Sequence, residues 1–317
     1  MQTLIQTKTQ LEHFLKTINS DSRLAIDTEF KRVNTYYPEL CLVQIATTHS
    51  SECIDVLLIN DLEPLYEKLY NNKTEWVAHS ARQDIEALYH LSKRIPSSLF
   101  DTQIAASLLN YPLQISYQAL SEILQDVQID KSFTRFDWTT RPLPANVIEY
   151  ALNDVRYLLS NFEKLKHQLT ISKKIQWLDE ETRFLLDQEL YEPSIEQICY
   201  KTKGLSQLEK KFQDQAIKLV AWRENNAQQQ NKPRKWLMSD QKLIDYACGK
   251  SELSTHSQKL FDDFVKESSE TFTLSKLLKP QKPLNNSEKR KKNELQRFIN
   301  SLGEAYNLSP EFICTNK

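Results

Sequence analysis

The chain has 317 residues, which at roughly 150 residues per domain is enough for two domains. Only three residues are glycine, where average usage of about 7% would give roughly 22, and residues 1–203 contain none. This excludes glycine-rich phosphate loops of the dinucleotide-binding, Walker and kinase types from that stretch, because each needs glycine for the backbone to approach phosphate. Hydrophobic residues make up 40% and charged residues 26%, as in globular proteins.

The net charge of −1 conceals an uneven distribution along the chain. Residues 1–200 contain 19 Lys and Arg against 28 Asp and Glu, whereas residues 201–317 contain 22 against 14. One interpretation is chance, with the charges on solvated surfaces. The other is that an acidic catalytic or metal-binding half is joined to a basic half that binds a polyanion.

Targeting and redox signals are few. No run of about 18 apolar residues is present, so no membrane contact is expected. The segment Met1–Leu4 does not begin a signal peptide. The five cysteines are odd in number and too scattered for a disulfide framework or a Cys-x-x-Cys metal pair, and we therefore expect a protein of the reducing cytoplasm.

Residues 1–170 are predicted to alternate between strands and helices. The predicted strands are 24–26, 40–46, 51–57, 75–78 and 99–100. The predicted helices are 10–18, 61–70, 82–91, 102–109, 118–125 and a long one over 145–169. Three consecutive strands followed by helix, strand and helix predict an α/β domain with a mixed sheet flanked by helices.

From about residue 173 onward only helical patterns are found. A long amphipathic helix is predicted over 207–226. Shorter helices are predicted at 239–247, 256–266 and 273–278, and a further helix at 293–306. Residues 280–287 are predicted to be a linker because they contain two prolines among polar residues.

Two carboxylates stand at the end of the first apolar strand, in the sequence Ile26-Asp27-Thr28-Glu29-Phe30. Residues i and i+2 of a strand face the same side, so Asp27 and Glu29 project together beside an apolar core. Unpaired, they would repel each other and lose hydration. A divalent cation such as Mg²⁺, which prefers oxygen ligands, would offset both effects. The alternative for this pair alone is an Asp that caps a loop beside a solvated Glu.

Three further residues extend this pattern. Asp84 lies in the first turn of a predicted helix, where an acid often only complements the helix dipole. Tyr150 and Asp154 are four residues apart and so share one face of the long predicted helix. They are either a buried hydrogen-bonded pair or a phenol and a carboxylate presented to the strand acids. In the second case the phenol would orient or deprotonate a water near a metal.

In this order, Asp27-x-Glu29, Asp84 and Tyr150-x-x-x-Asp154 resemble the three motifs of the DEDD exonucleases, in the subgroup that uses tyrosine. Other segments resemble the ribonuclease D family: Asp27-Thr28-Glu29-Phe30, Thr35-Tyr36-Tyr37-Pro38, Leu42-x-Gln44, Asp101-Thr102-Gln103, Asp130-Lys131-Ser132 and Asp137-Trp138-x-x-Arg141-Pro142-Leu143. Residues 205–249 are similar to the helical HRDC module that RecQ-type helicases and ribonuclease D share.

The resemblance implies a ribonuclease-H-like exonuclease domain over 1–170 and a helical connector over 171–203. It also implies an all-α HRDC domain over 204–280, then a linker and an incomplete second HRDC-like module over 281–317. The implied activity is 3′→5′ hydrolysis of RNA to 5′-mononucleotides, with tRNA precursors that carry 3′ trailers as the first substrate. No obligate protein partner is expected.

The same resemblance implies roles for the five residues of the motifs. Asp27, Glu29 and Asp154 would hold the divalent cation, Mg²⁺ or Mn²⁺, that activates the attacking water. Asp27 would also bridge to a second cation near the leaving 3′ oxygen, which Asp84 would support. Tyr150 would position the water. Two such cations stabilise both oxygens of an in-line displacement.

Substrate contacts are predicted more broadly, each with a structural alternative. The predicted residues of the first half are Gln44, His79, Arg135, Trp138 and Arg141. The two arginines would hold phosphate and Trp138 would stack on a terminal base, or the three would form a structural loop. His79 would approach the substrate or be a core histidine with internal partners. The predicted residues of the basic half are Lys232, Arg234 and Lys235, beside a second basic run over 289–292. If the basic residues bind RNA, affinity should fall steeply with salt.

Two other functions stay open from the sequence. Werner-type DNA exonucleases share the acidic motifs, and the 2′-hydroxyl contacts that distinguish RNA from DNA cannot be identified in a sequence. A non-catalytic RNA-binding protein descended from a nuclease is the alternative from another class. The presence of all four carboxylates and of Tyr150 argues against that alternative.

Overall fold

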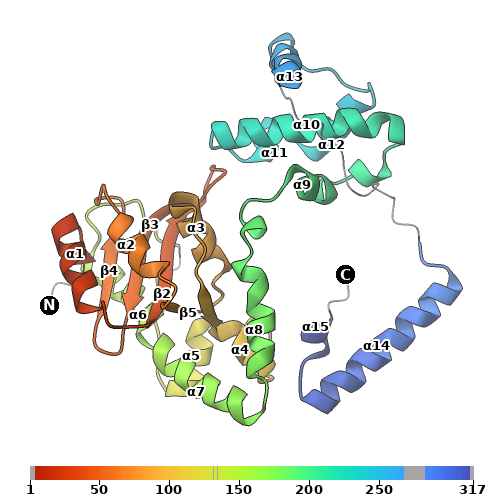
Figure 1. Ribbon diagram of the computed structural model, residues 1–317. Coiled ribbons are helices and arrows are strands. Elements are labelled where there is room, and N and C mark those ends of the chain that lie inside the picture. The colour runs from red at the N-terminus through yellow and green to blue at the C-terminus, as the bar shows by residue number, and fades with distance from the viewer. Residues whose placement is uncertain (1–3, 131, 134, 268–282, 315–317) are drawn as a thin grey trace. The chain divides into compact units, whose positions relative to one another are not determined.

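The structure is a computed structural model that describes residues 4–267, apart from 131 and 134, and residues 283–314 (Figure 1). The chain divides into two compact units. Unit 1 comprises Met1–Lys31, Pro38–Gln188 and Ser287–Lys317, and unit 2 comprises Arg32–Tyr37 and Glu189–Asn286. This division differs from the predicted domains, because the first unit extends to residue 188 and residues 287–317 group with it.

Unit 1 is built on a six-stranded mixed sheet with the strand order β1-β4-β3-β2-β5-β6. The strands are β1 (Leu4–Ile5), β2 (Arg23–Lys31), β3 (Glu39–Ala46), β4 (Ser51–Asp55), β5 (Glu75–Ala78) and β6 (Ser98–Asp101). β2 lies near the middle, antiparallel to β3 and parallel to β5. The predicted mixed sheet is therefore confirmed.

Helices make up most of the rest of unit 1 (Figure 1). They are α1 (Lys8–Thr17), α2 (Glu63–Leu69), α3 (Arg82–Ser92), α4 (Thr102–Leu108), α5 (Tyr117–Gln125), α6 (Ala145–Arg156), α7 (Leu158–Ile171), α8 (Ile175–Arg183), α14 (Asn286–Tyr306) and α15 (Pro310–Ile313). Residues beyond α14 pack on this unit. Lys174 Nζ donates to the Asn307 carbonyl at 3.2 Å, and Leu308 belongs to the same apolar cluster as Phe162.

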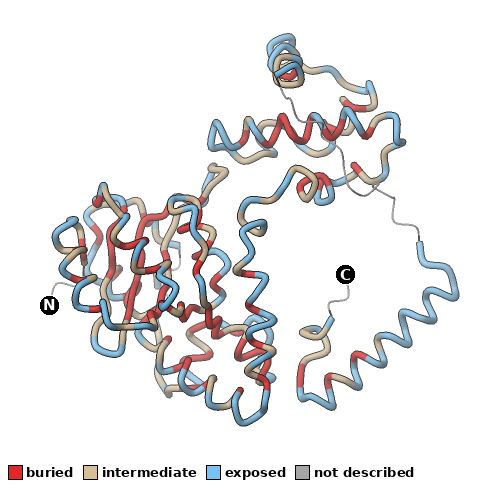
Figure 2. The backbone as a smooth tube through the Cα atoms, in the orientation of Figure 1, coloured by how far each residue is buried: buried red, intermediate tan, exposed pale blue. Residues whose placement is uncertain are grey.

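The core of unit 1 lies along the central strands (Figure 2). Every residue of β3 after Glu39 is buried, as expected for a continuous apolar run covered on both faces of a sheet. Helix α6 packs against β2, β3 and β4. Polar side chains on the α6 face of these strands are consequently shielded from water at least in part.

The prediction of one continuous helix over 145–169 is wrong, because the structure has two helices there, α6 and α7. In a continuous helix, the Tyr157 amide would donate to the Asn153 carbonyl, four residues earlier. Instead the Tyr117 hydroxyl lies between them: it accepts from the Tyr157 amide and donates to the Asn153 carbonyl, each at 3.0 Å. A side chain inserted into the backbone ladder is a recognised cause of helix breaks.

Turns that need a left-handed backbone are made without glycine in the first 203 residues. The residues with positive φ there are Asn34, Ser80, Lys93, Asn110, Gln114, Asp126 and Lys173. Two of them, Lys93 and Asp126, follow the last residues of α3 and α5 as left-handed caps. Asparagine and aspartate tolerate this conformation better than most residues, so the glycine shortage is compatible with a compact sheet domain.

Unit 2 is helical, as predicted. Its helices are α9 (Ile195–Lys201), α10 (Lys210–Gln229), α11 (Arg234–Leu237), α12 (Asp240–Ala247) and α13 (Thr255–Glu267), with short 3-10 turns η2 (Gln188–Leu190) and η3 (Leu205–Gln207) at its start. The predicted helix at 273–278 and the first three residues of the predicted linker at 280–287 lie outside the described residues, and residues 286–287 already belong to α14. None of the helices in the described part of the chain combines the length and apolar character that a membrane span requires.

Within unit 2, the segment Arg32–Tyr37 lies on the end of α10. Asn231 Oδ1 accepts from the amides of Tyr36 and Tyr37 at 3.1 and 3.0 Å. The Tyr36 hydroxyl donates to Glu224 Oε1, and Arg234 donates to the same oxygen at 2.9 Å. Glu224 is buried, so these two donors satisfy its Oε1, whereas its Oε2 has no hydrogen-bond partner among the described residues.

Asp101 is the N-cap residue of helix α4. Its buried carboxylate precedes α4, where Oδ1 accepts from the amides of Gln103 and Ile104 at 2.8 and 3.2 Å. Oδ1 also accepts from Ser80, and Oδ2 accepts from Ala81, at 3.2 and 2.8 Å. One side chain thus joins the end of β6 to the turn that precedes α3.

We expect Asp101→Ala to lower the free energy of unfolding by about 2 kcal/mol or more, since four backbone amides lose an acceptor. Asp101→Asn keeps Oδ1 and loses only the acceptor opposite Ala81, so the decrease in the free energy of unfolding should be smaller. Urea denaturation followed by circular dichroism measures both. Equal stability of Asp101→Ala and the unchanged chain would contradict this role.

Candidate active site

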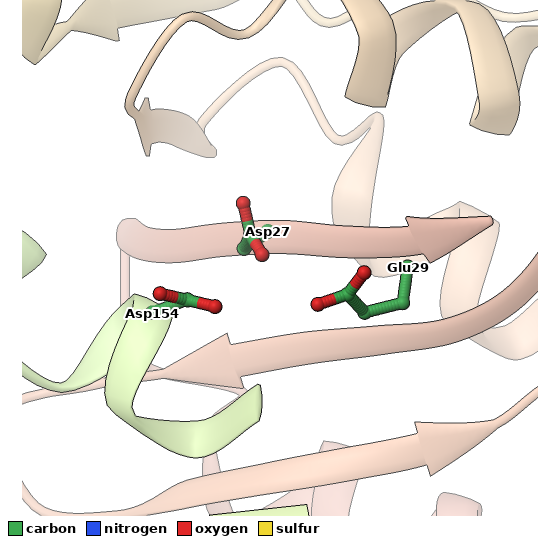
Figure 3. A group of neighbouring side chains, drawn as sticks. All are labelled: Asp27, Glu29 and Asp154. Carbon is green, nitrogen blue, oxygen red and sulfur yellow. The ribbon is translucent and has the colours of Figure 1, made fainter. Parts of the chain in front are cut away.

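Three of the predicted acidic residues lie together beneath α6. Figure 3 shows Asp27 and Glu29 on strand β2 and Asp154 on the helix beside it, with their carboxylates directed toward a common space. One oxygen from each carboxylate lies within 4.8 Å of the others. The structure thus brings together acids that are 127 residues apart in the chain, from Asp27 to Asp154.

Two regular geometries produce this cluster. Strand alternation sends Asp27 and Glu29 to the same face of β2, because they are two residues apart. On that face α6 crosses β2, and Asp154 lies in its last turn. Tyr150 is one turn earlier on the same helix, where it is buried. The motif spacing therefore corresponds to one face of strand β2 and one face of helix α6.

The cluster carries a strong electrostatic penalty. Burial raises the pKa of Asp27 and Glu29 well above the ordinary range, and the charges of Asp84 and Asp154 raise both further. Burial likewise raises the pKa of Asp154 to about 7. In the absence of a cation these carboxyl groups therefore retain protons that exposed acids release. A cation between them would stabilise the ionised forms.

Asp84 lies next to this cluster but is oriented differently. Its Oδ1 accepts from the Thr28 hydroxyl at 2.6 Å and from the Thr28 amide at 3.1 Å. Burial raises the pKa of Asp84 to about 7 even though both hydrogen bonds oppose the shift. Asp84 is close enough to interact electrostatically with Asp27 and Glu29, without belonging to the group of three.

Tyr150 is enclosed by aromatic rings. Its ring centroid is 5.8 Å from that of Phe133 and 6.3 Å from that of Trp138. Trp138 was predicted to stack on a terminal base, but its side chain is buried against Tyr150 and Phe136. Trp138 therefore packs beside Tyr150 and limits the movement of its ring.

Arg141 was predicted to hold phosphate, and the structure gives it another role. Its guanidinium forms a bidentate pair with the buried Asp55, with both distances 2.7 Å. The remaining N–H groups donate to the carbonyls of Cys41, Trp138 and Thr140 at 2.7–3.1 Å. Arginine has five N–H donors, and all five are engaged within unit 1. Arg141 therefore fixes the loop before α6 to the sheet.

His79 also has internal partners for both ring nitrogens. Nδ1 is 2.9 Å from the Thr102 hydroxyl, and Nε2 is 2.9 Å from the Ile115 carbonyl. Burial lowers the pKa of His79, so the neutral ring is favoured. His79 is therefore a core histidine with internal hydrogen-bond partners, which is the alternative to a substrate contact.

Gln44 is completely buried and faces the acid cluster from β3. It is paired with Asp27 in the antiparallel register, and cross-strand partners share a face of the sheet. Within the described residues, neither amide atom of Gln44 has a hydrogen-bond partner. Because the side chain has no exposed surface, it lies beneath the acids and not on a surface open to a nucleotide.

The remaining predicted contacts lie at the surface. Arg135 is exposed in the loop before α6. Lys232 and Lys235 are exposed around α11, whereas Arg234 is half-buried and paired with Glu224. Arg234 thus has a structural partner within unit 2.

Sequence reasoning missed three residues that shape the site: Thr28, Asp55 and Tyr117. Thr28 binds Asp84, Asp55 binds Arg141, and the Tyr117 hydroxyl ends α6 just beyond Asp154. Thr28 lies inside the acidic motif and could have been proposed from it. The other two act through contacts between distant segments, for which the sequence contains no local signal.

The donor set fits a divalent metal ion. Three half-buried carboxylates that face one another are hard oxygen ligands, which suit Mg²⁺ or Mn²⁺, and their mutual repulsion is relieved by positive charge. Asp27, Glu29 and Asp154 are the residues that would hold it.

Comparison with known proteins agrees with this chemistry. A family model described as a 3′-5′ exonuclease matches residues 2–170. The chain belongs to this 3′-5′ exonuclease family. It is also similar to two curated ribonucleases D. One, from Bartonella henselae, is 40% identical over 78% of this chain and 61% of its own length. The other, from Sphingobium indicum, is 37% identical over 77% and 63%.

The chain thus spans less than two thirds of the length of those relatives. Among solved structures, Escherichia coli RNase D, described as an exoribonuclease involved in structured RNA processing, aligns with a TM-score of 0.85 and 25% identity. The alignment covers 99% of this chain and 88% of that one. The predicted ribonuclease-H-like fold and the resemblance to ribonuclease D are both confirmed.

The Arg141–Asp55 pair generates a stability prediction. Arg141→Ala leaves the fully buried Asp55 carboxylate without its main partner, which should lower the free energy of unfolding by about 3–5 kcal/mol. The double variant Arg141→Met with Asp55→Leu removes both charges and should recover much of that loss. Chemical denaturation of the three proteins tests this. If Arg141→Ala is as stable as the unchanged chain, the pair does not fix the loop.

The raised carboxyl pKa values predict how stability depends on pH without metal. The unfolded chain releases the protons of Asp84 and Asp154 near their ordinary value of 3.8, whereas the folded protein keeps them to about pH 7. Between those values the unfolded state binds fewer protons, so stability contributed by these groups falls as pH rises. Above about pH 7 both states are ionised and the loss is complete.

Thermal unfolding in the presence of a chelator, from pH 4.5 to 8, measures this dependence. Asp154→Asn should flatten the decline, and Mn²⁺ should stabilise the unchanged chain more at pH 8 than at pH 5. A decline that is the same in Asp154→Asn would show that this carboxyl group does not contribute to it.

Proposed function

We propose that the chain is a divalent-metal-dependent 3′-5′ exoribonuclease that shortens the 3′ ends of structured RNA, with tRNA precursors that carry 3′ trailers as the first substrate. The observation that carries the proposal is the meeting of Asp27, Glu29 and Asp154, all half-buried, with one carboxylate oxygen of each within 4.8 Å of the others. The similarity to ribonucleases D supports RNA as the substrate class.

The chemistry assigns a task to each residue. When bound, two divalent cations supply stabilisation of the attacking and leaving oxygens of the phosphodiester. Asp27, Glu29 and Asp154 would provide the oxygen ligands of one cation, and Asp27 also interacts electrostatically with the neighbouring Asp84. Thr28 fixes the Asp84 carboxylate, which supports the second position. Release of a 5′-mononucleotide follows from hydrolysis at the last phosphodiester.

Tyr150 is the residue proposed to orient the attacking water. It lies one helical turn before Asp154, and the rings of Phe133 and Trp138 limit its movement. A phenol fixed in this way can accept or donate one hydrogen bond in a constant direction, which is what in-line attack requires.

The basic residues of unit 2 are proposed to bind the RNA backbone without reading its sequence. Lys232 and Lys235 are exposed, and Trp236 between them and α12 is 63% exposed. Cationic side chains with an interleaved aromatic ring suit the phosphates and bases of single-stranded RNA. Arg135 is proposed to make a similar phosphate contact beside the active site.

Hydrolysis of a 3′-extended tRNA with Mn²⁺ tests the proposal. We expect Asp27→Ala to abolish trimming and Tyr150→Phe to slow it by about 10²–10⁴-fold. Tyr111→Phe is the matched control, because the Tyr111 hydroxyl bonds to Gln168 and not to the acid cluster. Its rate should equal that of the unchanged chain.

A single-stranded DNA of the same sequence as the trailer provides the second arm of the assay. Faster cleavage of the RNA supports the proposed substrate. Preference for the DNA would contradict the substrate, and trimming by Asp27→Ala at the normal rate would contradict the site itself.

A further inference from the structure

Tyr117 is a buried residue at the first position of α5 that no motif identifies. Its hydroxyl donates to the Asn153 carbonyl and accepts from the Tyr157 amide, at 3.0 Å each. These two backbone groups would bond directly to each other in an uninterrupted helix. The phenol hydroxyl therefore stands in the place of one backbone hydrogen bond, between α6 and α7.

The break lies immediately beyond the metal-binding end of α6. Asp154 follows Asn153, whose carbonyl receives the Tyr117 hydrogen bond, and α6 ends at Arg156. Without the insertion, the backbone could continue as one helix through residue 171. The last turn of α6, which carries Asp154, would then follow the axis of that longer helix.

We propose that Tyr117 is a positioning residue for Asp154: its hydroxyl separates α6 from α7 and so directs the Asp154 carboxylate toward Asp27 and Glu29. This inference rests on the proposed metal-dependent function. It adds to that function a residue that touches neither substrate nor metal and acts only through the helix end.

The position of the Tyr117 hydroxyl is itself fixed by further contacts. Helix α5 is joined to α7 by Asn161, which donates to the Ser121 hydroxyl at 2.8 Å and accepts from Gln125 at 3.0 Å. Ser121 and Asn161 are fully buried, so this polar contact fixes one helix against the other. The edge of the Tyr117 ring also meets His79, with ring centroids 5.8 Å apart.

The chemical state of the phenol suits this task. Burial raises the pKa of Tyr117 well above its ordinary value, and the nearby charges of Asp154 and Asp27 raise it further. The hydroxyl thus keeps its proton and remains both donor and acceptor. The two backbone groups are satisfied at the same time, which a phenylalanine cannot do.

The test is the affinity of the full chain for Mn²⁺ alone, measured by isothermal titration calorimetry. Tyr117→Phe keeps the ring and its packing but removes the hydroxyl. Loss of a residue that orients a metal ligand typically weakens metal binding by 10–100-fold. We therefore expect the dissociation constant to rise by about tenfold or more, with circular dichroism showing a folded protein.

Tyr111→Phe is the matched control. Tyr111 also places its hydroxyl on α7, 3.5 Å from Gln168, which lies near the far end of α7, whereas Asp154 lies on α6. Its Mn²⁺ affinity should equal that of the unchanged chain. In the trimming assay, raising the Mn²⁺ concentration should restore the rate of Tyr117→Phe, because the metal ligands themselves are intact.

The outcomes separate this inference from the proposed function. If the unchanged chain binds no Mn²⁺, or if Asp154→Asn binds it normally, the proposed function fails. If the unchanged chain binds Mn²⁺, Asp154→Asn loses it, and Tyr117→Phe matches the unchanged chain, the positioning role alone is overturned. A loss of thermal stability in Tyr117→Phe without a change in Mn²⁺ affinity gives that same negative result.

Discussion

Repulsion among carboxylates in a shielded space is the constraint on which the rest of unit 1 depends. Asp27, Glu29 and Asp154 meet within 4.8 Å, and Asp84 adds its charge from the neighbouring helix. Removing such groups from water is costly, and their proximity adds to the cost. A fold that keeps them together must be rigid around them, and it must gain from a cation that binds there.

That rigidity comes from polar contacts between segments far apart in the chain. Arg141 joins the loop before α6 to Asp55 on β4, and Asp101 joins the end of β6 to the turn before α3. Thr28 fixes Asp84 from the strand that carries the other acids. Each contact satisfies a buried charge, and each lies beside an element that carries an acid of the cluster. The residues that stabilise unit 1 therefore also help to position the acids of the site.

Much of the site was predictable because it depends on periodicity. The i, i+2 spacing of a strand predicts that Asp27 and Glu29 share one face, and the i, i+4 spacing of a helix predicts that Tyr150 and Asp154 share another. That Asp154 faces the strand acids was implied only by the resemblance to the DEDD exonucleases. The roles of Arg141 and Trp138 were not predictable, because the partner of each side chain lies in the fold. The local sequence does not distinguish an arginine that binds phosphate from one that pairs with a buried carboxylate. The same holds for the break after α6, which depends on a hydroxyl 40 residues upstream of Tyr157.

We propose that β2 and α6 together form a divalent-cation site. The most direct measurement is anomalous X-ray diffraction from a crystal of the chain soaked in Mn²⁺, which locates the ion independently of any assay. We expect an anomalous peak coordinated by Asp27, Glu29 and Asp154. Carboxylates held apart with no peak between them, at a Mn²⁺ concentration that supports activity, would contradict it.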